Sequence, residues 1–142
     1  MSEGSLFDRL GGRPTFEKVH KVFYDKIYEH PWLAPYFKGV DQKTIENQQT
    51  DFMISNMGGG RVYSGRFPKP AHQHMNISAE LFEVRNCLLQ DSLKECDIPQ
   101  ELAEQWLKID YAFKHSLVKS GAHECVKRFF TDEILDFPKP SG

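Results

Sequence analysis

The residues of this chain best able to bind a metal ion or transfer a proton are six histidines: His20, His30, His72, His74, His115 and His123. No two of them have the i, i+4 spacing that brings two zinc ligands together on a helix. His72 and His74 form a His-x-His pair that could chelate a metal in an extended chain, yet no third ligand with suitable spacing is nearby. The histidine pattern therefore argues against a zinc or two-metal site.

Other catalytic signatures are also missing. The sequence contains no Gly-x-Ser-x-Gly motif, no phosphate-binding loop and no dinucleotide fingerprint. Gly58, Gly59 and Gly60 follow a predicted helix, whereas the phosphate and dinucleotide motifs need a strand before their glycines. The three cysteines form neither Cys-x-x-Cys nor Cys-x-x-Cys-His, which excludes a zinc knuckle and a cofactor attached through thioethers. We predict no catalytic residue.

What remains is a combination of residue types that suits a haem pocket. A histidine lies at the end of a glycine- and proline-rich segment, Tyr24 lies within a predicted helix, and Gln48 and Gln49 interrupt the apolar face of another. Eleven Phe, five Tyr and two Trp make up 13% of the chain, enough flat apolar surface to enclose a large planar group. Haem needs an axial imidazole, apolar walls and a few hydrogen-bond donors on the opposite side. Taken alone, Tyr24 is equally well explained as a core aromatic.

The elements that position these residues are predicted to be helices, because apolar residues recur at helical spacing and almost nothing alternates as in a strand. Gly11 and Gly12 end the first short helix, His30-Pro31 ends the second, and Asp41 is the predicted N-cap of the third. A long loop from 58 to 76 separates the third helix from the fourth. The predicted helices cover 6–10, 15–29, 41–57, 78–95 and 99–120, and a further short helix is expected in 122–142.

Length and composition are consistent with one ordinary domain. The chain has 142 residues and a formal charge of −2 without a basic block, which argues against a nucleic-acid partner. The first 30 residues have no signal-peptide pattern and no run of about 18 apolar residues occurs, so we expect no membrane span and a cytoplasmic location.

Several motifs resemble those of the truncated haemoglobins, short globins with a two-over-two helical sandwich. The likeness runs from about Ser5 to Ser120. It rests on the following segments: Leu6-Phe7-Asp8-Arg9-Leu10-Gly11-Gly12, Val22-Phe23-Tyr24, Leu33-Ala34-Pro35-Tyr36-Phe37, Met57-Gly58-Gly59, Tyr63-Ser64-Gly65-Arg66, and Ala71-His72-Gln73 with Ile77 five residues after the histidine. The resemblance implies an all-α truncated-globin domain over 1–120, with a C-terminal extension over 121–142.

The resemblance also implies a role for each site residue, with non-covalent haem b, iron protoporphyrin IX, as the cofactor. His72 would be the iron ligand and Tyr24 the distal hydroxyl. Gln48 and Gln49 would be a polar distal pair, with the apolar Ile45 where many globins have a distal histidine. The remaining pocket residues would be Phe37, Phe52, Met53 and Phe82, together with Val84 and Phe113, and Tyr63, Arg66 and Lys43 would face the propionates.

Two features depart from the family pattern. Arg85 falls where some members have a tryptophan or a small apolar residue facing the distal side. Lys114 to Val118 resembles the last helix of group II, whereas Tyr63 to Arg66 resembles the corresponding segment of group I.

The function implied is reversible binding of oxygen and other diatomic ligands, with nitric oxide and carbon monoxide as further partners. Oxygen transport, nitric oxide detoxification and ligand sensing all suit such a site, although no second domain is present to receive a signal. Detoxification would make the protein a nitric oxide dioxygenase and would need an external reductase, because no flavin or nicotinamide motif is present. The protein could be a monomer or a homodimer. The alternative is an all-α interaction protein without a cofactor.

Overall fold

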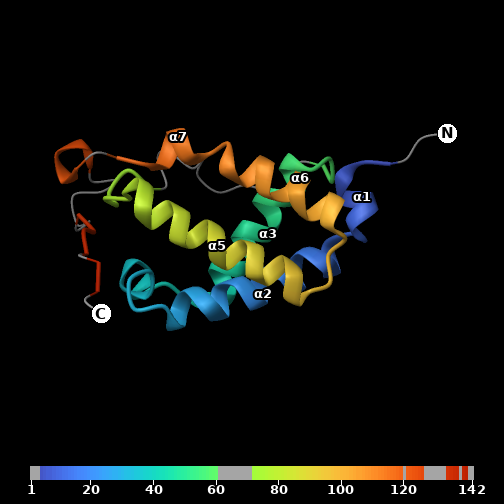
Figure 1. Cartoon of the computed structure of the whole chain (residues 1–142), viewed down its shortest axis with the longest axis horizontal. Coiled ribbons are helices and arrows are strands. Elements are labelled where there is room, and N and C mark those ends of the chain that lie inside the picture. The colour runs from blue at the N-terminus through green and yellow to red at the C-terminus, as the bar shows by residue number, and fades with distance from the viewer. Residues whose placement is uncertain (1–3, 61–71, 120, 127–133, 138, 141–142) are drawn as a thin grey trace.

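The protein is helical throughout the part that the structure describes. The computed structural model describes residues 4–60, 72–119, 121–126, 134–137 and 139–140. Figure 1 shows the helices packed side by side along the longest axis of the molecule, with the N-terminus at one end and the C-terminal extension at the other. Among the described helices, none is both long enough and apolar enough to cross a membrane.

The short helix α1 (Leu6–Leu10) is held by a capping box at its start and by glycines at its end. The Ser5 side chain accepts from the Asp8 amide, and the Asp8 side chain accepts from the Ser5 amide. Gly11 follows in the left-handed conformation with φ of 103°, which a side chain would disfavour. Gly59 permits a close approach to α1, because a Cβ atom there would lie 2.9 Å from the Phe7 ring.

Helix α2 (Arg13–Glu29) buries one face and carries Tyr24. Pro14 favours its first turn, and the chain leaves the helix at His30 before Pro31. Its buried residues follow the helical repeat and are Phe16, Val19, His20, Phe23, Tyr24 and Ile27. A 3-10 turn, η1 (Ala34–Phe37), then buries Tyr36.

Helix α3 (Gln42–Asn56) begins at Asp41, as predicted, because the Asp41 carboxylate accepts from the Thr44 amide. Its buried face differs from the predicted one. Glu46 and Thr50 are buried together with Met53 and Ile54, whereas Gln48 is exposed. The predicted face included Gln48 and omitted Glu46 and Thr50. Hydrogen bonds between Gln42 and Glu46 and between His20 and Thr50 satisfy these two polar side chains inside the protein.

The last long helices are α5 (Ala79–Glu95) and α6 (Gln100–Tyr111). Ser78 caps α5 by accepting from the Leu81 amide. Helix α6 ends at Tyr111, earlier than the prediction of one helix to residue 120, and a separate turn α7 (Lys114–Leu117) follows. The break lies where Phe113 packs against Phe52 of α3, with ring centroids 5.1 Å apart. Periodicity alone did not predict this contact or the break in the helix.

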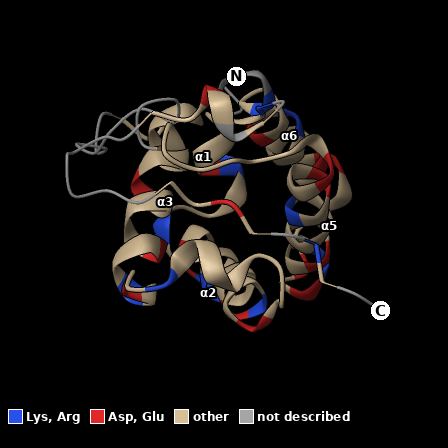
Figure 2. Cartoon of the chain, turned by 90° about the vertical axis from the view of Figure 1, so that its left-hand side faces the viewer, with Lys and Arg blue, Asp and Glu red and all other residues tan. Residues whose placement is uncertain are grey.

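The long helices form two pairs. Helix α2 packs on α3 and on α5, and α5 packs on α6. Viewed from the end of the molecule, α5 and α6 lie to one side of α2 and α3 (Figure 2). The Phe16 ring of α2 stacks on the Trp106 ring of α6 at a centroid distance of 4.8 Å, and neither residue is exposed to solvent. This arrangement confirms the predicted all-α fold.

The described part of the C-terminal extension runs along the segment between His72 and Ile77. It contains a 3-10 turn, η2 (Ala122–Glu124), and two isolated parallel β-bridges join Met75 to Leu135 and Ile77 to Val118. The additional short helix predicted in 122–142 falls largely on 127–133, which lie outside the described residues.

Candidate haem and gas-ligand site

Tyr24 lies in the core with its hydroxyl unpaired. Its side chain is 4% exposed and contacts the rings of Phe23 and Phe37 at centroid distances of 5.1 and 6.0 Å. Within the described part of the chain, no acceptor receives a hydrogen bond from its hydroxyl group. Burial raises the pKa of Tyr24, so the phenol stays protonated and remains a donor. The hydroxyl is therefore available to donate to a bound ligand.

The two glutamines of α3 lie in different environments. Gln49 is half-buried, and its carboxamide makes no hydrogen bond to the described residues, whereas Gln48 is exposed. Ile45, one helical turn before Gln49, is half-buried and packs against the core. Of the two predicted polar residues, Gln49 is therefore the one with access to the interior, and a role for Gln48 stays a prediction.

A buried histidine lies one helical turn from Tyr24, and sequence reasoning missed its role. His20 Nδ1 lies 2.7 Å from the Thr50 hydroxyl oxygen, and its ring lies 6.4 Å from the Tyr24 ring. Burial, reinforced by the nearby Arg85 cation, lowers the pKa of His20 to about 3. The imidazole is therefore neutral at physiological pH. Its spacing of four residues before Tyr24 was the only signal in the sequence.

Arg85 forms a buried ion pair with Asp110. The two bonds of this bidentate pair measure 2.6 and 3.0 Å, and the Asp110 side chain is 4% exposed. The guanidinium also lies 5.2 Å from the centroid of the Phe23 ring and 5.7 Å from that of Phe82. Burial opposes the charge on Arg85, but the Asp110 carboxylate outweighs it and raises the pKa of Arg85. Arg85 therefore stays charged in the core.

The Arg85 guanidinium has N–H donors that Asp110 does not use. An arginine has five N–H groups, and Asp110 takes two of them. The described residues provide no other hydrogen-bond acceptor for Arg85, although 21% of its side chain is accessible. Its charge also acts on Tyr24, whose pKa it lowers against the larger effect of burial. Arg85 is therefore a second donor near Tyr24.

We expect loss of one member of this ion pair to destabilise the protein strongly. Asp110→Asn leaves the Arg85 cation buried without a counter-charge, which should lower the free energy of unfolding by about 3–5 kcal/mol. The double variant Arg85→Met/Asp110→Leu should recover most of that loss, because neither charge is then buried. Urea unfolding of the apoprotein measures both effects, and Lys21→Met, which removes an exposed ion pair with Asp25, is the control. Equal stability of Asp110→Asn and wild type would contradict the prediction.

The predicted apolar walls are contributed by several helices. Met53 and Phe82 are buried, whereas Phe37, Phe52, Val84 and Phe113 are partly buried. Lys43 is exposed, and Tyr63 and Arg66 lie outside the described residues. The assignment of these residues to haem contacts stays a prediction.

His72 lies in a segment whose backbone is firmly held. Its carbonyl oxygen accepts from the Met75 amide at 2.9 Å and from Lys119 Nζ at 3.0 Å. The His72 side chain is half-buried, whereas His74 is 4% exposed. Burial alone therefore does not distinguish which of the two histidines would bind iron. In the described residues, no group of three or more His, Cys, Asp or Glu side chains could hold a metal ion.

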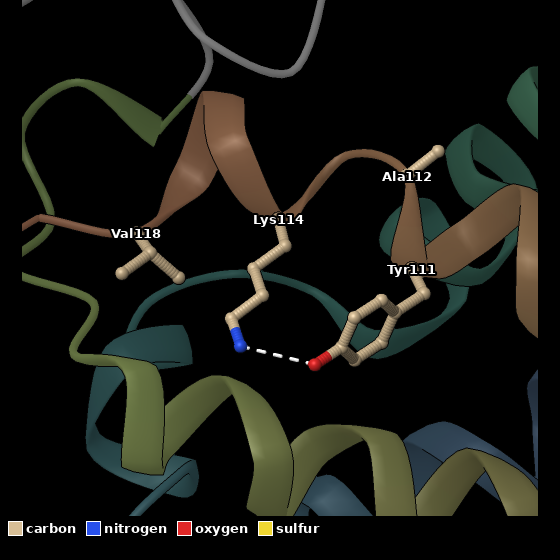
Figure 3. A pocket seen from close by; sticks show the side chains of 4 residues that line it. All are labelled: Tyr111, Ala112, Lys114 and Val118. Carbon is tan, nitrogen blue, oxygen red and sulfur yellow. Dashed lines mark hydrogen bonds between the residues drawn. The ribbon is translucent and has the colours of Figure 1, made fainter.

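A pocket of about 410 Å³ lies at the junction of α6 and α7. Tyr111, Ala112, Lys114 and Val118 line it, and Lys114 Nζ lies 3.0 Å from the Tyr111 hydroxyl (Figure 3). Both groups also bond the Glu83 carboxylate of α5. Since Val118 pairs with Ile77, the pocket borders the segment that begins at His72. These polar contacts fix the start of α7 against α5.

The two pairs of long helices have the arrangement of the two-over-two globin fold. Comparisons with known proteins agree. Residues 5–119 match the model of the family described as "Bacterial-like globin", and the chain belongs to this family. Globins carry haem and bind diatomic gases, so the cofactor-free interaction protein is not favoured.

Individual relatives and solved structures support the assignment. The chain is 28% identical over 103 residues to the group 1 truncated haemoglobin GlbN of Mycolicibacterium paratuberculosis, covering 72% of this chain and 76% of that protein. It is similar to the structure of Chlamydomonas reinhardtii THB1, with 31% identity, a TM-score of 0.66, and 84% and 100% of the two chains covered. The truncated haemoglobin of Tetrahymena pyriformis shares the fold, with 24% identity, a TM-score of 0.76, and 82% and 100% covered.

Proposed function

We propose that this protein reversibly binds oxygen on a non-covalent haem b, with His72 as the axial ligand and Tyr24 as the main donor to the bound gas. The observation that carries the proposal is Tyr24, whose side chain lies in the core, stays protonated and donates to no described residue. Natural cores rarely leave such a group without a partner unless a ligand or water supplies one.

The residues on the Tyr24 side suit haem and a small polar ligand. Phe37, Phe52, Met53 and Phe82 offer apolar surface to a flat macrocycle, and His72 offers an imidazole. When bound, haem supplies the iron at which diatomic gases coordinate. Tyr24 and Gln49 would then orient the gas by donating to it. The neutral His20, one helical turn before Tyr24, adds no competing charge.

Nitric oxide detoxification would need a partner protein that supplies electrons. Bound haem would supply the redox chemistry that oxidises nitric oxide to nitrate, and repeated turnover would need an electron donor. The chain carries no flavin or nicotinamide motif, so we infer that nitric oxide detoxification would depend on an external reductase. Reversible oxygen and carbon monoxide binding needs no such partner. We propose a cytoplasmic protein that is a monomer or a homodimer.

Haem addition to the purified apoprotein tests the proposal. Titration with hemin should produce a Soret band that saturates at one hemin per chain and persists through gel filtration. Reduction and exposure to oxygen should then give a spectrum that reverts when oxygen is removed. A protein that stays colourless and takes up no hemin would rule out the proposed function.

A further inference from the structure

The C-terminal extension bonds directly to the backbone around His72. The Val126 amide donates to the Gln73 carbonyl oxygen at 2.7 Å, and the Leu135 amide donates to that of His74 at 2.8 Å. The Asn76 amide returns a bond of 2.7 Å to the Leu135 carbonyl oxygen. The segment after His72 is thus paired with residues more than 50 positions later in the sequence.

Lys119 also bonds the backbone of this segment. Its amide donates to the Ile77 carbonyl oxygen at 2.8 Å, and its Nζ donates to the His72 carbonyl oxygen at 3.0 Å. A single residue therefore fixes both ends of the segment 72–77.

The extension also contacts the turn that follows α2, the helix that carries Tyr24. Trp32 Nε1 donates to the Phe137 carbonyl oxygen at 3.0 Å, and the Phe137 amide donates to the Tyr36 hydroxyl at 3.1 Å. The Tyr36 hydroxyl in turn lies 3.2 Å from the Asn76 carbonyl oxygen. Its neighbour Phe37 contacts the Tyr24 ring. In the end view, the extension crosses the end of the helical bundle (Figure 2).

We propose that the C-terminal extension, together with Lys119 just before it, is a positioning element for His72, acting through the bonds from Lys119, Val126 and Leu135 to the backbone of residues 72–77. The proposal rests on the proposed function, because it assumes that His72 binds the iron. An axial imidazole can bind tightly only if its backbone holds the ring at the correct height and rotation. Backbone bonds on both sides of the segment restrict both movements.

Lys119→Met tests the proposal in the full-length protein. The substitution keeps the apolar part of the side chain and the backbone amide but removes the bond to the His72 carbonyl oxygen. A hydrogen bond from a charged group contributes enough for about a tenfold effect. We therefore expect hemin to transfer to excess apomyoglobin about tenfold faster than from wild type. Lys139→Met is the matched control, because it removes only the ion pair with Glu80, and both of these side chains are exposed to solvent.

Two further measurements separate positioning from general stabilisation. Resonance Raman spectra of the ferrous, ligand-free protein should show a shifted iron–histidine stretching band in Lys119→Met and an unchanged band in Lys139→Met. Leu135→Pro, which removes the amide bonded to His74, should shift the same band more than Leu135→Ala, which keeps that amide. In the apoprotein, hydrogen exchange at Asn76 should accelerate in Lys119→Met and Leu135→Pro.

The outcomes distinguish the two proposals. If wild type takes up no hemin, the proposed function fails. If wild type binds hemin, but Lys119→Met and Leu135→Pro keep both the stretching band and the hemin transfer rate of their controls, the extension does not position His72. A lower melting temperature without a change in the band would also overturn the inference, since it would mean that the extension only stabilises the fold.

Discussion

His72→Ala should abolish stable haem binding, whereas His74→Ala should leave the Soret spectrum unchanged. His72 is helical and His74 lies in the turn that follows it, and two residues separated by one position in such a turn do not face the same side, so we expect only one of them to reach the iron. Only one of these histidines can be axial, and the resemblance to truncated haemoglobins places it at His72.

The measurement is hemin retention through gel filtration, followed by the Soret absorbance per chain. Because His74 is buried, its replacement by alanine leaves a cavity, and His74→Gln is a second variant that keeps most of the volume. Urea unfolding of each apoprotein shows whether a variant has folded. Loss of hemin in folded His74→Gln together with retention in His72→Ala would show that His74 is the iron ligand.

Local signals in the sequence were enough to predict most of the helices. Asp41 and Ser78 cap α3 and α5 as their residue types predict, and Gly11 ends α1 with positive φ. These features depend on neighbouring residues only. The end of α6 was predicted wrongly, because the contact between Phe113 and Phe52 joins positions 61 residues apart, and periodicity carries no information about it.

The pairing of buried polar residues at the site was also not predicted from the sequence. Arg85 stood out in the sequence, but its partner Asp110 did not, although Leu102, Trp106 and Asp110 follow one another at intervals of four residues on the buried face of α6. An acid in such a series requires a buried cation, and that requirement could have linked it to Arg85. The pairing of His20 with Thr50 had no comparable signal, since hydroxyl and imidazole groups are common on either face of a helix.

The contacts of the C-terminal extension could not be predicted for a different reason. Its apolar residues indicated that it would pack against something, but hydrogen bonds between main-chain groups hold it to residues 73–77. Main-chain groups are the same in every residue except proline, so the sequence does not specify which of them will pair. Only the fold brings Leu135 beside Met75.

Tyr24→Phe should release oxygen about 10- to 150-fold faster than wild type. Bound dioxygen carries partial negative charge, so a hydroxyl directed at it makes a bond of the charge-assisted kind, worth about 1.5–3 kcal/mol. At about 1.4 kcal/mol for each factor of ten, its loss gives this range of rates. Carbon monoxide is far less polarised and should be released at nearly the wild-type rate. The substitution removes only the hydroxyl, which bonds no described residue, so the fold should be unaffected.

Stopped-flow release of oxygen and carbon monoxide from Tyr24→Phe, Gln49→Leu and the double variant measures the effect. If Tyr24 and Gln49 donate in one network, the double variant should release oxygen more slowly than the product of the two single effects predicts. Asn47→Leu is the matched control, because Asn47 is exposed on the same helix and its loss should change neither rate. Equal oxygen release from wild type and Tyr24→Phe would show that the tyrosine is only an apolar wall. Arg85, with three N–H groups beyond those bonded to Asp110, would then be the donor to replace.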